Sequence, residues 1–120
     1  MSQQASIKTT DLVNCPVTAT MDVIGGKWKI LILYLISNDI RRFGKLSMLL
    51  KSISKQMLTT QLRELERDGI ISRVIYPEIP PRVEYFLTEK GEALQPVFSA
   101  LRDWGNKYEV AQPELLTSNF

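Results

Sequence analysis

The sequence predicts a mainly helical α+β fold, in which four helices precede a β-hairpin and a last helix follows it. Apolar residues recur at helical spacing through the first half of the chain. β-Branched and aromatic residues then gather in two short runs, Ile70–Tyr76 and Arg82–Leu87. Helical spacing returns after Thr88, a residue type that caps helices well. These three observations predict one mixed domain with a single β-hairpin.

The length of 120 residues is about that of one domain. We expect a single core over residues 15–110, a flexible arm over residues 1–14 and a loose tail over residues 111–120. The longest apolar stretch, Ile30–Ile36, is far shorter than the roughly 20 residues of a membrane span. Because the N-terminus also lacks the pattern of a secretory signal, we expect a cytoplasmic protein.

A glycine pair separates the first two predicted helices. Pro16 suits the first position of a helix, where its missing N–H costs nothing, so we expect a helix from there to Ile24. Gly25-Gly26 ends it, and a second helix follows over Lys27–Ser37. The apolar residues predicted to form the buried face of this second helix are Trp28, Leu31, Ile32 and Leu35.

The next segment contains two more helices before the strands begin. Ile40–Phe43 is a candidate edge strand, and Phe43–Leu50 is predicted to form a third helix. Ser54 is a good N-cap for a fourth helix, which runs to about Asp68 and stops at Gly69.

Prolines define the hairpin tip and interrupt the last helix. The tip Pro77-Glu78-Ile79-Pro80-Pro81 is stiff and cannot continue a strand ladder. After Thr88, Pro96 lies inside the helical pattern and predicts a kink or a break. The residues on one face of this last segment are Leu94, Val97, Phe98, Leu101, Trp104 and Tyr108.

Two short helices followed by a β-hairpin are typical of a winged helix-turn-helix, whose second helix enters the major groove of DNA. In the fourth helix, Leu58, Leu62 and Leu65 share the face that we expect to be buried. Glutamine suits adenine, arginine suits guanine, and threonine can contact a base edge or the thymine methyl. Our candidate DNA-binding residues are Ser54, Lys55, Gln56, Thr59, Thr60 and Arg63 on this helix, Lys45 before it, and Arg82 in the wing.

The charge distribution agrees with a nucleic-acid surface. Residues 41–67 contain seven basic residues and two acidic ones, a net +5 in a chain whose total is +2. A polyanion needs such a basic segment, although many solvated helix faces are also basic. For Arg82 the alternatives are a backbone contact with DNA and an ion pair with Glu78 or Glu84.

Composition excludes several enzyme classes. The chain has no histidine and one cysteine, Cys15, so Ser-His-Asp and Cys-His mechanisms, an internal disulfide and a cysteine-based metal cluster are excluded. We expect no enzyme activity, no metal and no cofactor. At a helix N-terminus the Cys15 thiol is either a reactive sensor with a lowered pKa or a small apolar residue, and we weigh these readings equally.

Several short motifs follow one another between Cys15 and Tyr108. They are Cys15-Pro16, Gly25-Gly26-Lys27-Trp28, Leu58–Leu65, Asp68-Gly69-Ile70-Ile71, Tyr76–Tyr85, Leu87–Gly91 and Trp104-Gly105. Together they resemble the HxlR family, a branch of the MarR-like winged-helix regulators. The resemblance implies a homodimeric repressor or activator on a pseudo-palindromic operator, with dimerisation through the terminal helices. It also implies that the cysteine matching Cys15 senses oxidants or electrophiles in some members.

The last helix gives an independent reason to expect a homodimer. We expect a domain this small to lack the core that would bury its apolar stripe, and we assign dimerisation to Phe98, Leu101, Trp104 and Tyr108. Alternatively the stripe packs on its own domain. The aromatic residues Trp28, Tyr34, Phe98 and Trp104 either line a pocket for a small-molecule effector or are plain core. The rival to DNA binding is a winged helix that serves only as a protein–protein interaction module.

Overall fold

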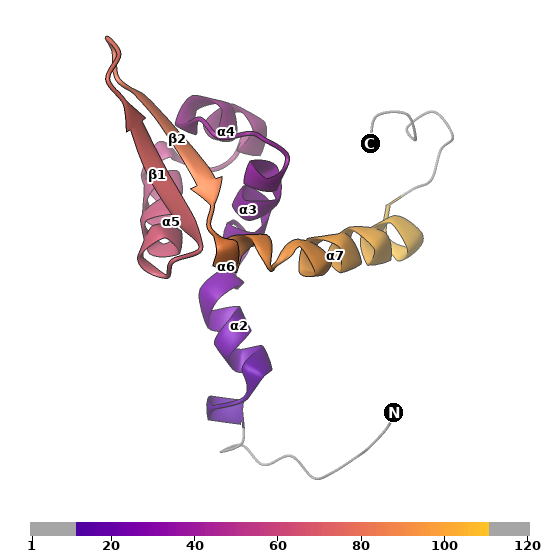
Figure 1. The fold of residues 1–120 in the computed structure, drawn as a ribbon. Helices are drawn as coiled ribbons and strands as arrows, with labels where there is room; N and C mark the ends of the chain where they lie inside the picture. Colours follow the sequence, from indigo (N-terminus) through magenta and orange to yellow (C-terminus); the bar gives the residue numbers. More distant parts are fainter. Residues whose placement is uncertain (1–11, 111–120) are drawn as a thin grey trace, which may run out of the picture.

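The computed structural model describes residues 12–110, and its elements follow the predicted order (Figure 1). The predicted arm lies outside the described residues as far as position 11, and the tail over residues 111–120 lies outside them entirely. The elements are α2 (Pro16–Ile24), α3 (Lys29–Ser37), α4 (Phe43–Leu50), α5 (Lys55–Arg67), β1 (Ile71–Tyr76), β2 (Arg82–Leu87), α6 (Glu89–Glu92) and α7 (Gln95–Tyr108).

Local chemistry explains where these helices begin and end. The Ser54 hydroxyl accepts a hydrogen bond from the Met57 amide at 3.0 Å, which satisfies one of the free N–H groups at the start of α5. Gly69 follows α5 with φ of +75°, a conformation that glycine adopts without steric cost. The predicted break near Pro96 is confirmed, because α6 ends at Glu92 and Pro96 lies in the first turn of α7.

The two strands form an antiparallel hairpin that a third segment extends. Tyr76 pairs with Arg82 at the tip end, and Ile71 pairs with Leu87 at the base. Arg42 forms an isolated bridge with Glu84, and the Tyr85 amide donates to the Arg41 carbonyl at 2.9 Å. The candidate edge strand before α4 is therefore present in this minimal form.

The core lies between α3, α5 and the hairpin. The buried leucines of α5 are Leu58, Leu62 and Leu65, as the spacing predicts. In α3 the buried residues are instead Lys29, Ile32, Leu33 and Ile36, and the helix begins two residues later than expected. The prediction that Leu31 belongs to the buried face is wrong, since it is exposed beside α7, while Trp28 and Leu35 are only partly buried.

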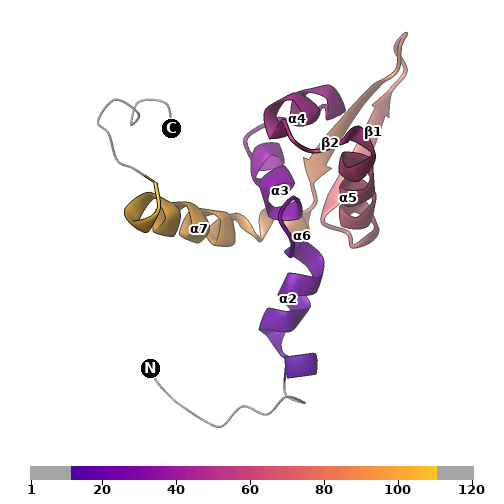
Figure 2. The same cartoon turned by 180° about the vertical axis from the view of Figure 1, so that it is seen from behind.

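Helices α2 and α7 extend away from this body in different directions (Figures 1 and 2). The radius of gyration is 17.1 Å, whereas a compact chain of this size has a radius of about 13 Å. Each of the two helices carries exposed apolar side chains, among them Val17, 70% exposed, on α2 and Trp104, 59% exposed, on α7. The chain on its own therefore leaves apolar helix surface uncovered.

Candidate nucleic-acid interface

Helix α5 presents a polar face on the side opposite its buried leucines. Ser54, Lys55, Gln56, Thr60 and Arg63 are exposed, and Thr59 is half-buried. Lys45, on α4, is also exposed. The structure thus leaves seven of the eight predicted contact residues accessible on the helix-turn-helix itself, and only Arg82 lies elsewhere, at the start of β2.

The two threonines of this face are already hydrogen-bonded within the helix. The Thr59 hydroxyl donates to the Lys55 carbonyl at 2.9 Å, and the Thr60 hydroxyl donates to the Gln56 carbonyl at 3.0 Å. Such bonds to the preceding turn fix the rotamer and use the hydroxyl proton. What each threonine offers outward is therefore a methyl group and oxygen lone pairs, which suit a thymine methyl or a base amino group.

A buried lysine neutralises one acidic residue of α5. Lys29 is only 8% exposed, and its Nζ lies 2.6 Å from Glu64 Oε1. The hydrogen bond from Lys29, followed by its positive charge, holds the pKa of Glu64 below its ordinary value. Sequence reasoning missed this contact, because an alternating basic-apolar stretch gives no sign of which lysine is buried.

The second acidic residue of the basic segment is also paired. Glu66 Oε2 lies 3.7 Å from Arg73 Nε, on β1. Both cations that pair with the acids of residues 41–67 therefore come from outside that segment. Among residues 12–110, no carboxylate forms an ion pair with Arg63. In turn, three arginines of that segment pair with acids outside it, Arg41 with Asp39, Arg42 with Glu84 and Arg67 with Asp68, so ion pairing does not add to its net positive charge.

Arg82 is held within the wing. Its Nε and one terminal nitrogen donate to Glu78 Oε2 at 3.1 and 2.9 Å, and the other terminal nitrogen donates to Glu84 Oε2. The guanidinium also lies 3.8 Å from the centre of the Tyr76 ring. Glu78 and then Glu84 raise the pKa of Arg82, and the bond from Arg82 lowers the pKa of Glu78. Of the two alternatives for this residue, the ion pair is the one the structure contains, with both carboxylates.

Cys15 is the N-cap of α2. Its sulfur accepts a hydrogen bond from the Thr18 amide at 3.3 Å and lies 3.2 Å from the Thr18 hydroxyl. The bonds from the Thr18 hydroxyl and then its amide lower the pKa of the Cys15 thiol, while partial burial opposes them. The thiol is half-buried, so it combines helix-terminal chemistry with some access to solvent.

The predicted dimerisation residues divide into two groups. Leu101, Trp104 and Tyr108 are exposed, and the rings of Trp104 and Tyr108 lie 5.4 Å apart. Phe98 corrects the prediction, because it is buried in its own chain with its ring edge-to-face against Tyr34, at 6.3 Å. Phe98 joins α7 to the body, and the residues that follow it leave the body.

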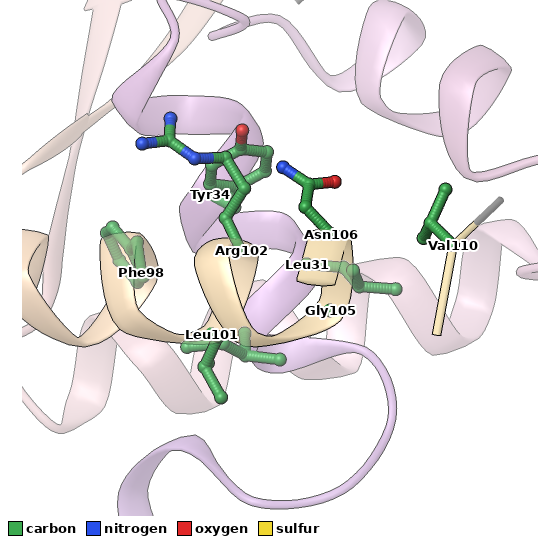
Figure 3. Close-up of a pocket in the computed structure, with 9 residues that line it drawn as sticks. Leu31, Tyr34, Phe98, Leu101, Arg102, Gly105, Asn106 and Val110 are labelled. Carbon is green, nitrogen blue, oxygen red and sulfur yellow. The ribbon is translucent and has the colours of Figure 1, made fainter. Parts of the chain in front are cut away.

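An apolar groove of about 370 Å³ lies between α3 and α7 (Figure 3). Leu31 and Tyr34 line it from α3, and Phe98 and Leu101 line it from α7. Of the four aromatic residues expected around one pocket, only Tyr34 and Phe98 line this groove together. Trp28 lines a separate groove beside α4, and Trp104 is exposed beside Tyr108.

Within the described part of the chain, no three His, Cys, Asp or Glu residues are grouped so that they would hold a metal ion. None of the helices found in residues 12–110 has the length and apolar character needed to cross a bilayer.

Comparison with known proteins identifies consistent relatives. A family model described as HxlR-like helix-turn-helix matches residues 23–113. The uncharacterized HTH-type transcriptional regulator YdeP of Bacillus subtilis is 50% identical over 99 residues, which cover 82% of this chain and 77% of that protein. The solved structure of the redox regulator HypR in its oxidized form is 46% identical with a TM-score of 0.75, covering 81% of this chain and all of that one. HypR in its reduced form is 47% identical with a TM-score of 0.73, covering 78% of this chain and 92% of that one.

Proposed function

The chain belongs to the HxlR-like helix-turn-helix family of transcriptional regulators, which are not enzymes, and we propose that it binds a specific operator as a homodimer. The observation that carries the proposal is the exposed polar face of α5. Lys55, Gln56 and Arg63 project from a helix whose opposite side is held in the core by leucines. A helix fixed in this way presents base-reading groups in a constant geometry.

Dimerisation would cover the apolar residues that α2 and α7, the two helices that extend from the body, leave exposed. It would also cover Leu31, which lies beside α7. Isolated exposed apolar residues are common, but two helices that carry several each mark an interaction surface. A two-fold pair would place two α5 helices on a pseudo-palindromic site, with the spacing of the half-sites set by the dimer. Such a regulator would act in the cytoplasm, where the DNA is.

Fluorescence anisotropy with labelled duplex from upstream of the chain's own gene tests DNA binding. The reduced protein is titrated across a salt series, with unlabelled unrelated duplex in excess. Tight binding that survives the competitor supports a sequence-specific regulator. The proposal would be contradicted if the protein bound neither this duplex nor any duplex selected from a random library, even at low salt. That result would favour a protein–protein interaction module.

Sedimentation equilibrium tests the dimer. The wild-type chain is expected at twice the chain mass, and Trp104→Ala is expected to dissociate at concentrations where the wild type does not. Met48→Ala is the matched control, because Met48 is as exposed as Trp104 but lies on α4. A wild-type monomer at micromolar concentration, or equal effects of the two substitutions, would refute the assignment.

We further propose that Cys15 switches the affinity for DNA. The support is its position at the start of α2, its lowered pKa, and the likeness to a redox regulator solved in two oxidation states. Diamide takes two electrons and two protons from two thiols and leaves one disulfide bond. With one cysteine in each chain, that bond joins Cys15 of both subunits, or Cys15 and a small thiol such as glutathione. An electrophile would instead form an alkyl adduct.

The test of the switch compares operator binding before and after diamide treatment. The affinity of the wild type is expected to change, and dithiothreitol is expected to restore it. Cys15→Ser is expected to bind DNA with the affinity of the reduced wild type, both before and after diamide treatment. If Cys15→Ser responds to diamide as the wild type does, the thiol is structural.

The groove between α3 and α7 is the place where a small apolar effector would bind. It is lined by Tyr34, Phe98 and Leu101 and has the volume of a small ligand site. Because α7 is also the proposed dimer helix, a ligand there would act by shifting α7. Saturable binding of an apolar compound in equilibrium dialysis, together with a changed affinity for DNA, would support this role.

A further inference from the structure

Lys29 is the one charged residue that the fold buries among residues 12–110. It is the first residue of α3, and its side chain extends to α5, where the Nζ atom lies 2.6 Å from Glu64 Oε1. The exposed fraction of the Lys29 side chain is 10%, whereas that of the Glu64 side chain is 36%. The ammonium end of this ion pair is therefore withdrawn from water, while the carboxylate end still reaches it.

A gain in stability is a poor explanation for this buried ammonium group. Moving the charge out of water is costly, and the attraction to one carboxylate does little more than offset that cost. A methionine in place of Lys29 would fill a similar volume without any charge to desolvate. What the ion pair offers, and an apolar contact does not, is a fixed direction.

The apolar packing of α5 leaves the rotation of the helix weakly fixed. Its buried residues are all leucines, and apolar cores tolerate rearrangement when the total volume is kept. The side-chain ends of a helix lie about 5–6 Å from its axis, so a rotation of about 20° moves them by about 2 Å. A hydrogen bond to a base edge does not survive that displacement, because its length stays within about 2.7–3.2 Å.

Three side chains from other elements form polar contacts with α5 or its C-cap in the described part of the chain. Arg73 on β1 is 3.7 Å from Glu66, and its side chain is about half exposed. Lys90 on α6 is exposed and donates to the Asp68 carbonyl at 3.0 Å. The contact from Lys29 is the one that is both short and buried, so it is the contact best able to hold α5 in one orientation.

Helix α3 is a rigid reference for this contact. Ile32 and Leu33 are fully buried and Ile36 is nearly so, which means that α3 cannot turn without disturbing the core. The helix lies between α5 and α7 (Figures 1 and 2), and its Tyr34 ring meets Phe98 of α7. The same helix therefore holds α5 on one side and the proposed dimer helix on the other.

We propose that Lys29 is a positioning residue for operator recognition, which fixes the rotation of α5 through Glu64 and so determines which base edges the exposed face of α5 reaches. Lys29 does not itself touch DNA, because its ammonium group is buried and paired. Arg63, the neighbour of Glu64, is the base-reading candidate whose direction depends most closely on the contact. The inference rests on the proposed DNA-binding function and adds to it a determinant of specificity.

Lys29→Met separates positioning from stability. Methionine keeps an unbranched stem and removes the charge, and Glu64 remains hydrated because it is partly exposed. The urea midpoint is expected to stay at the wild-type value or to rise. Anisotropy then compares an operator selected from a random library with its single-base-pair variants. Discrimination between them is expected to fall about tenfold, the loss of one well-placed base contact. Affinity for unrelated duplex and the salt slope are expected to stay unchanged, because no phosphate contact is lost.

Lys90→Met is the matched control, since it makes the same chemical change at the exposed contact with Asp68. It is expected to leave both the urea midpoint and the discrimination close to those of the wild type. An equal loss of discrimination in the two lysine variants would show that any loosened contact near α5 has this effect, and Lys29 would have no special role.

Substitutions of Glu64 test the same contact from the other side. Glu64→Gln keeps an oxygen that accepts from Lys29, whereas Glu64→Ala does not. Both remove the same charge, so any general gain in affinity for DNA is shared. Glutamine is expected to keep the discrimination of the wild type, and alanine is expected to lose about tenfold of it. This comparison decides the question if Lys29→Met does not fold.

Three further outcomes would overturn the inference while leaving the proposed function intact. The first is the discrimination of the wild type in a folded Lys29→Met. The second is a reduced salt slope in Lys29→Met with equal weakening on all duplexes, which would show a phosphate contact. The third is equal discrimination by Glu64→Gln and Glu64→Ala. If the wild type selects no sequence from the library, the proposed function itself fails.

Discussion

Substitution of Leu62 by alanine tests the orientation of α5, on which the proposed interface depends. Leu62 is 2% exposed and lies between Leu58 and Leu65, which are fully buried. Alanine removes three carbon atoms from this packed site. Substitutions of this kind cost about 2–5 kcal/mol, through lost burial and the cavity left behind. Because both neighbouring turns of α5 are fixed in the core, little collapse is available, and we expect about 3 kcal/mol.

Urea unfolding followed by circular dichroism measures this loss. With a slope of about 2 kcal/mol per molar urea, the midpoint is expected to fall by about 1.5 M while the slope stays constant. Protomer concentration must be the same for all variants, since self-association adds to apparent stability. The control is Met57→Ala on the same helix, where the side chain is exposed and the expected change is within about 0.5 kcal/mol.

The result that refutes the reasoning is a loss of less than about 1 kcal/mol in Leu62→Ala, or an equal loss in both variants. Either would mean that α5 does not hold its leucine face in the core. The polar face with Gln56, Thr60 and Arg63 would then have no fixed direction, and the proposed contact with the major groove would lose its structural basis.

Three further predictions concern α5 and its contacts. Glu64→Gln removes a carboxylate whose pKa is lowered by Lys29, so the wild type should exceed the variant in unfolding free energy at neutral pH. This stabilisation is fully present above the unfolded pKa of about 4.3 and is lost as the pH falls through the lower folded pKa; equal differences at pH 7 and pH 3 in urea titrations would contradict it. Arg63→Ala should cost about 1–3 kcal/mol on the selected operator and relax one base position, and a loss shared by all sequences would show a backbone contact instead. Ser54→Ala should destabilise the chain by about 1 kcal/mol in urea unfolding and Ser54→Gly by only a few tenths, whereas the reverse order would show that the bond to Met57 is not a cap.

Local sequence signals were sufficient for the order of the elements and for much of the helix-turn-helix. The limits of α4 and β2 agree with the patterns, and the Ser54 cap and the break near Pro96 are present. Each of these features depends on a few neighbouring residues, which is why a single sequence reveals them. The buried leucines of α5 could also be predicted from the sequence, because a helix with so few apolar residues can bury only one face.

The failures concern side chains whose environment is set by distant parts of the chain. Helix α3 is apolar on most of its surface, so periodicity alone could not separate Leu31, which faces the groove beside α7, from Ile32 and Leu33 in the core. Phe98 and Trp104 share one stripe in the sequence, but only Phe98 reaches Tyr34 before α7 leaves the body. A periodic stripe indicates which residues can be buried together and leaves open which neighbour buries them.

Arg82 shows why a basic residue in a wing is weak evidence for a phosphate contact. Arg82 follows Glu78 by four residues and precedes Glu84 by two. In the hairpin, both separations allow an ion pair with the Arg82 guanidinium. In the folded hairpin one guanidinium satisfies both carboxylates and stacks on Tyr76, which fixes the loop more strongly than any one of these contacts would alone. An incoming phosphate would have to replace two anions that are already in place. In a wing built in this way, the hydrogen bonds of Arg82 join the loop to β2, and a contact between Arg82 and DNA stays a prediction.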